Sequence, residues 1–201
     1  MAASIAAVVG LGNPGPDYAR TRHNAGFWLV DRLAARQGGT FRRESKFHGE
    51  VCRVSVEGNE LWLLKPVTYM NLSGDAVAAL ARFYRFGAEQ IIVAHDELDL
   101  PPGATRLKKD GGAGGHNGLG DIIEKLASRD FYRLRIGIGH PGSRELVTPY
   151  VLGRPPASEE DEIIASIDEA LAVLPLVLGG QVNKAMTHLN RRPPATDTTT
   201  Q

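Results

Sequence analysis

The sequence predicts a single α/β domain with a mixed, mostly parallel central sheet and helices on both faces (α/β/α). Short apolar runs rich in Val and Ile alternate along the chain with longer segments of helical period, the order of elements in α/β proteins. The chain has 201 residues, 42% of them hydrophobic and 23% charged, which is typical of one globular domain. We place the domain at residues 1–190 and expect residues 191–201, rich in Pro and Thr, to form a flexible tail.

Apolar runs and turn residues define the elements of the N-terminal half. We expect strands at residues 5–11, 50–56 and 61–65, and helices at residues 25–37 and 74–84. Asn24 and Ser73 are candidate N-caps of the two helices, because their side-chain oxygens can accept unpaired amide hydrogens. The strands at 50–56 and 61–65 form a predicted hairpin around residues 57–60.

The C-terminal half continues the alternation of strands and helices. We expect strands at residues 91–95, 104–107 and 132–139, and helices at residues 118–126, 159–178 and 182–190. The short run at 104–107 is a candidate edge strand. The helix that starts at Glu159 has an acidic first turn, which complements the helix dipole.

Charge is balanced overall but segregated along the chain. The 23 Lys and Arg equal the 23 Asp and Glu in number. Residues 20–53 hold eight bases and three acids, residues 106–154 nine bases and five acids, and residues 159–169 six acids and no base. The balance excludes a strongly basic, nonspecific nucleic-acid binder, but it allows a local basic patch. We expect the basic segments near the functional site and the acidic helix start elsewhere.

The cysteine content and the apolar runs indicate in which cellular compartment the protein acts. Cys52 is the only cysteine, which rules out an internal disulfide framework and fits a reducing compartment. The apolar N-terminus lacks the basic start of an export signal, and the longest apolar run, 170–178, is too short to span a bilayer. We therefore expect no membrane association.

Polar, glycine-rich segments follow several of the predicted strands, at residues 10–15, 68–71, 95–99 and 111–118. In open α/β sheets, sites form beyond the carboxyl ends of the strands. We therefore expect the segments after Leu11, after Lys65, after Val93 and near Leu107 to converge in one crevice.

His23 and Asp96 are the candidate catalytic pair. Histidine changes charge near neutral pH and can act as a base, and a carboxylate at the end of a central strand could hold it in one tautomer. These loops offer no obvious Ser or Cys nucleophile, so the simplest chemistry is attack by water. Asparagine amides would then position the substrate and polarise a carbonyl group.

Other interpretations of these segments remain open at this stage. Gly10-x-Gly12 follows a strand as in a dinucleotide site, but Pro14 interrupts that pattern. A metal site at residues 95–97 is disfavoured because neighbours on a strand face opposite sides. We therefore expect no cofactor and no metal. The glycines of 111–118 suit a flexible lid or close approach of a ligand, and the bases at 108–109, 133 and 135 suit a solvated face or a phosphate clamp.

Six motifs, in this order and at this spacing, resemble those of bacterial peptidyl-tRNA hydrolases. They are VGLGNPG (9–15), TRHNAG (21–26), KPVTYMNLSG (65–74), HDELDLPPG (95–103), GGHNG (114–118) and RLRIGIGHP (133–141). The resemblance covers residues 5–190. It implies a cytoplasmic, monomeric α/β/α enzyme without a cofactor, which cleaves the ester between a peptide and the 3′ end of tRNA and so recycles tRNA from prematurely released peptidyl-tRNA.

The resemblance also implies roles for individual residues. The matched motifs make His23 the catalytic base, Asp96 the group that orients it, and Asn13 a catalytic amide. Tyr18 matches an aromatic residue at the pocket for the tRNA end, and Asn71 and Asn117 match residues that bind substrate or position water. Substrate or tRNA binding is also implied for Met70, Gly114, Gly115 and His116. Lys108 and Arg135 match a basic pair at the tRNA 5′ phosphate. As a hypothesis of our own, Asn13 or Asn71 donates a hydrogen bond to the developing oxyanion.

Two other classes of function stay open. One is a nonenzymatic RNA-binding protein of the same fold, which the intact His23 and Asp96 disfavour. The other is a small-molecule hydrolase or nucleotide-binding protein, which predicts a closed pocket and no dependence on tRNA phosphate.

Overall fold

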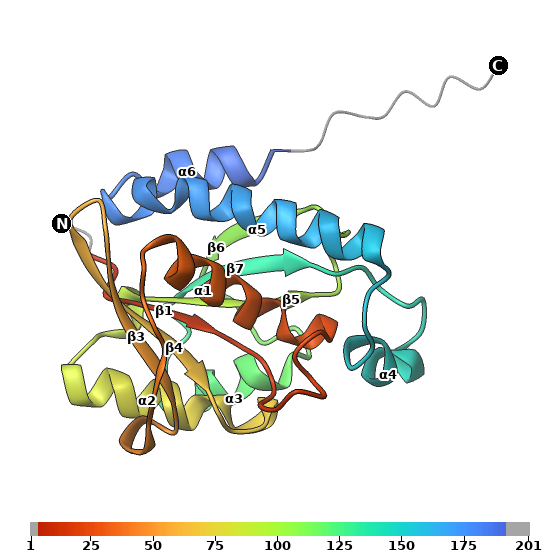
Figure 1. Cartoon of the computed structure of the whole chain (residues 1–201), viewed down its shortest axis with the longest axis horizontal. Helices are drawn as coiled ribbons and strands as arrows, with labels where there is room; N and C mark the ends of the chain where they lie inside the picture. The colour runs from red at the N-terminus through yellow and green to blue at the C-terminus, as the bar shows by residue number, and fades with distance from the viewer. Residues whose placement is uncertain (1–3, 192–201) are drawn as a thin grey trace.

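The chain folds around one seven-stranded mixed sheet, with strand order β2-β3-β4-β1-β5-β7-β6 (Figure 1). The computed structural model describes residues 4–191. The strands are β1 (Ala7–Gly10), β2 (Arg42–Glu44), β3 (Gly49–Val56), β4 (Asn59–Pro66), β5 (Ile91–Glu97), β6 (Thr105–Lys109) and β7 (Tyr132–Gly137). The predicted strands are thus present, and the short β2 is an additional one.

Helices cover both faces of the sheet, as Figure 1 shows. They are α1 (Ala25–Arg36), α2 (Ser73–Tyr84), α3 (Asn117–Leu126), α4 (Val147–Val151), α5 (Ala157–Leu178) and α6 (Val182–Leu189). α1, α5 and α6 pack with one face of the sheet in a buried cluster that includes Leu29, Ile92 and Ile167. α2 and α3 pack on the other face around Val77 and Val93. The predicted α/β/α architecture is confirmed.

The direction of the strands determines where a site can form. β4, β1, β5 and β7 are parallel neighbours, so their carboxyl ends meet at one edge of the sheet, called the carboxyl edge below. β2 and β3 extend the sheet antiparallel on one side, and β6 does so on the other. Gly10 pairs with Ala94, so the chain leaves β1 two residues before the level of Asp96 in β5.

The position near Leu107 is a correction to the predicted convergence. β6 runs antiparallel to β7 and its last residue, Lys109, pairs with Tyr132 at the start of β7. β6 therefore ends at the edge opposite the carboxyl edge, and Leu107 itself is buried in the core. The following glycine-rich loop brings the chain back to the carboxyl edge at His116. A strand's direction in a mixed sheet depends on long-range pairing, which local sequence does not reveal.

Both predicted N-caps bind elsewhere. No side-chain capping bond forms at Asn24, whose amide instead bonds to the backbone of Asn13. Ser73 lies inside α2, and its hydroxyl donates to the Met70 carbonyl. The predicted hairpin turn is also shorter: Glu57 and Gly58 alone connect β3 and β4, with φ of 49° and 80°. Such positive φ values at both turn residues match the twist of a two-residue hairpin.

None of the helices in residues 4–191 is both long and apolar enough to cross a membrane. The predicted tail at 191–201 lies, from residue 192 on, outside the described residues.

Candidate active site

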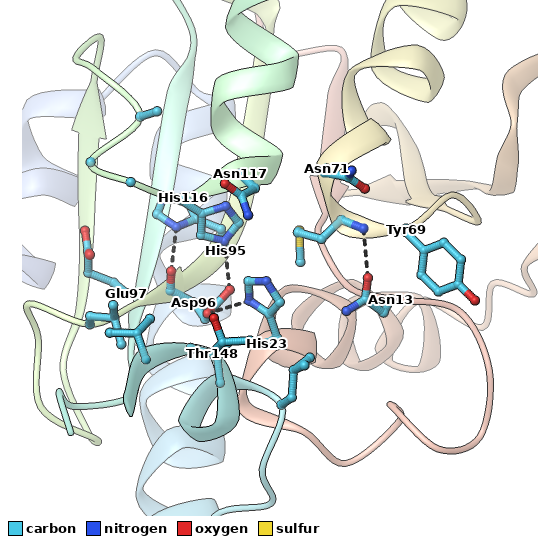
Figure 2. Close-up of a pocket in the computed structure, with 18 of the residues that line it drawn as sticks. Asn13, His23, Tyr69, Asn71, His95, Asp96, Glu97, His116, Asn117 and Thr148 are labelled. Carbon is cyan, nitrogen blue, oxygen red and sulfur yellow. Dashed lines mark hydrogen bonds and ion pairs between the residues drawn. The ribbon is translucent and has the colours of Figure 1, made fainter. Parts of the chain in front are cut away.

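A crevice of about 640 Å³ opens at the carboxyl edge of the sheet (Figure 2). Most of the predicted site residues line it: Asn13, His23, Met70, Asn71, Asp96, Gly114, Gly115, His116 and Asn117. They come from the segments after β1 and β4, from the end of β5, and from the loop before α3 and the first residue of that helix. The predicted convergence at this edge is therefore correct for these segments.

A close approach between α1 and the sheet brings His23 to Asp96. His23 lies in a single 3-10 turn, Arg22–Asn24, directly before α1. A Cβ atom on Gly26 would lie 2.3 Å from the Ala94 carbonyl oxygen and 2.5 Å from the Leu11 amide nitrogen. Only glycine lets the first turn of α1 touch β5 and the end of β1. That contact places His23 beside Asp96, which is part of β5.

His23 and Asp96 form a direct hydrogen bond. The distance from His23 Nδ1 to Asp96 Oδ2 is 2.8 Å, and the Asp96 side chain is almost fully buried. Because a carboxylate only accepts hydrogen bonds, Nδ1 carries the proton. The neutral imidazole then keeps its lone pair on Nε2, the nitrogen left open to the crevice. This is the tautomer that a general base requires.

The pair also shifts each partner's pKa. Burial alone would lower the pKa of His23, but the charge of Asp96 and its hydrogen bond raise it, and the net pKa lies above the usual 6.5. Burial alone would raise the pKa of Asp96, but His23 and His116 hold it well below its usual range. Asp96 thus stays ionised and favours the protonated form of His23.

A second imidazole shares the same carboxylate. His116 is the N-cap of α3, where its Nδ1 accepts the Leu119 amide hydrogen at 3.3 Å. Its proton therefore resides on Nε2, which donates to Asp96 Oδ1 at 2.9 Å. The two oxygens of Asp96 are held by two different rings, which fixes the plane of the carboxylate.

His23, Asp96 and His116 also meet the spacing of a metal site, since their ligand atoms lie within 4.8 Å of one another. Both ring nitrogens that face Asp96 are hydrogen-bond donors, however, and a donor cannot ligate a metal. If His116 moved its proton to Nδ1, it would point that proton at the Leu119 amide. The hydrogen bonds of this cluster thus favour proton transfer over metal ligation.

His95 closes the inner wall of the crevice in a neutral form. Its Nδ1 donates to the Asp96 carbonyl at 2.8 Å, and the side chain is 2% exposed. Burial and the neighbouring His116 lower the pKa of His95 to about 3. His95 adds no positive charge beside the base at neutral pH.

Asn13 presents a hydrogen-bond donor to the crevice. Its backbone is held by Asn24 on both sides, with bonds of 2.8 and 2.9 Å. The Asn13 Oδ1 atom accepts the Met70 amide hydrogen at 2.8 Å, so the amide group cannot flip freely. Its Nδ2 group is therefore turned toward His23 (Figure 2). This explains the binding of Asn24 to Asn13 in place of a helix cap.

The outer rim of the crevice is polar and aromatic. Asn71 and Asn117 are exposed there, unlike the buried Asn13. Tyr18 does not line the crevice itself, but its ring packs edge-on against Tyr69, with 6.4 Å between centroids. Tyr69 lines the crevice and is 61% exposed. Its place in the segment after β4 pointed to it, although we did not single it out from the sequence.

An apolar wall opposite the glycine loop was not predicted. Val147, Val151 and Leu152, in and after α4, line the crevice together with Leu98. The spacing of Val147 and Val151 by four residues is a helical signal, but Pro149 lies between them and α4 spans only five residues. This wall offers apolar contact within reach of the polar site.

Lys108 and Arg135 lie outside the crevice, in a separate groove of about 520 Å³ between β6, β7 and α6. Arg135 forms an ion pair of 2.7 Å with Glu97, which lines the crevice. Lys108 is exposed. The basic pair is thus adjacent to the catalytic groups but not among them, and an anion at Arg135 would compete with Glu97.

The acidic start of α5 does not line the crevice, but it lies beside the first basic segment. Glu160 binds Arg20 at 2.8 Å and Glu159 binds Arg22 at 3.2 Å. Further along α5, Asp168 binds Arg32 and Arg36. Much of the positive charge of residues 20–36 is therefore neutralised within the fold.

Comparison with known proteins identifies relatives over nearly the whole chain. Residues 7–197 match the family described as peptidyl-tRNA hydrolase. A peptidyl-tRNA hydrolase from Edwardsiella ictaluri is 56% identical over 188 residues, covering 93% of this chain and 96% of that one. One from Nitrosospira multiformis is 56% identical over 184 residues, covering 91% and 96%. A crystal structure of the Acinetobacter baumannii peptidyl-tRNA hydrolase matches with a TM-score of 0.91 at 51% identity, covering 95% and 97%.

Proposed function

The chain belongs to the peptidyl-tRNA hydrolase family, and we propose that it hydrolyses its substrate with a water molecule activated by His23. It is an enzyme that cleaves the ester between a peptide and tRNA, and tRNA is released for reuse. One observation carries the proposed mechanism. An oriented base, His23, and a fixed donor, Asn13, face the same crevice.

The reaction proceeds in two steps. His23 Nε2 takes a proton from water while the water oxygen bonds to the ester carbonyl carbon, and the Asn13 amide donates to the resulting oxyanion. Asp96 stabilises the imidazolium that forms. The tetrahedral intermediate then collapses, the bond to the ribose oxygen breaks, and His23 returns its proton to that oxygen. An alkoxide is a better leaving group than an amide ion, so this chemistry needs no covalent intermediate.

We assign substrate binding to the remaining predicted residues, together with Tyr69 and the apolar wall. The apolar wall at Val147 and Val151 suits the peptide, and the tyrosine pair of Tyr18 and Tyr69 suits stacking of bases at the 3′ CCA end. The rim residues that we propose for substrate contact are Met70, Asn71, Gly114, Gly115, His116 and Asn117. Lys108 and Arg135 suit the 5′ phosphate region. We propose that the protein acts as a monomer and that the cytoplasm is its site of action.

An ester-release assay tests this proposal. The purified chain is mixed with N-acetyl-aminoacyl-tRNA, and the freed N-acetyl amino acid is measured over time. We expect rapid release from the full tRNA and slow release from the N-acetyl-aminoacyl ester of adenosine. Binding of tRNA without release would instead support a nonenzymatic RNA-binding protein. Equal release from both esters would support a small-molecule hydrolase.

Affinity for tRNA should fall steeply as salt concentration rises. Contacts to phosphate release counterions, so the logarithm of the binding constant falls linearly with the logarithm of salt concentration. Lys108→Ala should make this slope shallower by about one unit. Arg53→Gln is the matched control, because Arg53 pairs with Glu60 on the β3–β4 hairpin. This substitution should leave the slope unchanged. A slope near zero for the parent chain would contradict tRNA recognition through phosphate.

Substitution of the two asparagines should separate their roles. We expect Asn13→Ala and Asn13→Asp to lower the single-turnover rate by about a hundredfold, the usual cost of one lost oxyanion donor. Asn13→Asp keeps the oxygen that accepts the Met70 amide hydrogen and removes only the Nδ2 donor. The fall in rate of this variant therefore measures the contribution of the donor. Asn71 is exposed at the rim, and its variants should mainly raise KM. An unchanged rate in both Asn13 variants would eliminate Asn13 as the donor.

A further inference from the structure

The loop that leads into His116 has little stabilisation of its own. It runs from Asp110 to Gly115, and φ is positive at Asp110, Gly111, Gly114 and Gly115. Glycines gain the most conformational freedom when released, so such a loop is costly to hold in one shape. The loop nevertheless forms one side of the crevice, through residues 113–115.

Arg133 holds the first part of this loop. Its guanidinium donates hydrogen bonds to the carbonyl groups of Gly111 and Gly112 and lies over the Phe131 ring, 4.7 Å from the centroid. The residue is 3% exposed. Within residues 4–191 no carboxylate forms an ion pair with it, and its Nε has no partner. Burial lowers the pKa of Arg133, yet arginine stays charged in proteins. The cation is thus stabilised by two loop carbonyls and one ring.

Lys108 converges on the same glycine from the neighbouring strand. Lys108 and Arg133 pair across the β6–β7 ladder, so their side chains leave the same face of the sheet. A Cβ atom on Gly111 would lie 3.1 Å from Lys108 Nζ and 3.8 Å from an Arg133 terminal nitrogen. An anion bound by Lys108 would therefore touch the loop where Arg133 holds it.

We propose that Arg133 is a positioning residue that couples phosphate binding at Lys108 to the geometry of the catalytic crevice. This inference rests on the proposed function, in which Lys108 binds the tRNA 5′ phosphate. A phosphate at Lys108 draws the two cations together and fixes Gly111 and Gly112. The other end of the loop is His116, which fixes the plane of the Asp96 carboxylate. An ordered loop thus holds His116 in place, and His116 in turn holds Asp96, the group that orients His23.

The first test is Arg133→Gln, with Arg129→Gln as the matched control. Arg129 is exposed, and its replacement removes a positive charge near Arg133. Within residues 4–191 its side chain forms no hydrogen bond or ion pair with the loop. We expect Arg133→Gln to lower kcat by about tenfold or more while KM changes by less than about threefold, since misplaced catalytic groups cost turnover rather than binding. Arg133→Lys should fall in between, because a lysine cannot bind both carbonyls at once. Arg129→Gln should match the parent chain.

Hydrogen exchange gives a readout that does not depend on activity. In Arg133→Gln the backbone amides of Asp110 and His116, which donate to the carbonyls of Phe131 and Ala113 at the two ends of the loop, should exchange faster, while amides of β5 and β7 keep their protection. An unfolded or globally destabilised variant would lose protection everywhere, and Arg133→Lys would then serve as the milder probe. Unchanged exchange at Asp110 and His116 in both variants would overturn the proposed role of Arg133.

The coupling itself is tested with substrates that carry or lack the 5′ phosphate. The parent chain should turn over the substrate with the 5′ phosphate faster than the substrate without it. This advantage should disappear in Lys108→Ala and in Arg133→Gln. The double variant should lose no more activity than either single variant. Additive losses in the double variant would overturn the coupling. If the parent chain cleaves no ester at all, the proposed function fails. If the parent chain cleaves the ester and the advantage of the 5′ phosphate persists in Arg133→Gln, only this inference fails.

Discussion

Replacement of His23 by alanine is expected to lower the single-turnover rate of ester cleavage by about a hundredfold or more, with tRNA affinity nearly unchanged. His23 Nε2 is the open nitrogen of an imidazole whose other nitrogen is held by Asp96. Alanine removes the proton acceptor but leaves the Asn13 donor and the rim residues in place. Rapid-quench measurement with enzyme in excess over N-acetyl-aminoacyl-tRNA isolates the chemical step from product release.

Two controls make the His23 result specific. His188→Ala removes an exposed histidine of α6, near Glu169, and should retain the full rate. Added imidazole should restore part of the rate to His23→Ala, because it can enter the vacated space and act as the base. A rate within about threefold of the parent chain in His23→Ala would rule out His23 as the base.

Local patterns predicted the parts of the fold that local physics determines. β1 and β5 were visible as apolar runs because they are buried on both faces of the sheet. The pairing of His23 with Asp96 followed from their positions just before a helix and at the end of a central strand. The parallel order of β4, β1, β5 and β7 then brought the polar segments to one edge, as the rule for open sheets requires.

The features that escaped prediction depend on contacts between distant parts of the chain. Asn24 suits a helix cap, but its amide gains two bonds to Asn13 that no local pattern shows. The apolar wall is formed largely by α4, a helix of only five residues that contains a proline and so gives a weak helical pattern in the sequence. The neutralisation of Arg22 by Glu159 joins residues 137 positions apart. Net charge along the sequence therefore overstated the free positive charge near the crevice.

Replacement of Asp96 by asparagine should both slow the reaction and shift its pH dependence. The parent kcat/KM should rise with pH and level off, because only neutral His23 accepts a proton, with a midpoint above 6.5 set by the raised pKa of His23. In Asp96→Asn the burial that lowers this pKa remains, while the charge that raises it is gone. The midpoint should therefore move to lower pH.

The rate itself should fall by about a hundredfold or more in Asp96→Asn, since an amide in place of the carboxylate disturbs the tautomer of the base. Asp96 accepts a proton from His23 at one oxygen and from His116 at the other. An asparagine offers one acceptor and one donor, so one of the two rings must turn its lone pair toward the amide. If that ring is His23, Nε2 carries the proton and cannot activate water. Asp99→Asn, an exposed change in the next turn, is the control. A kcat/KM profile of Asp96→Asn with the parent midpoint would show that another group titrates, and the assignment of the base would then be wrong.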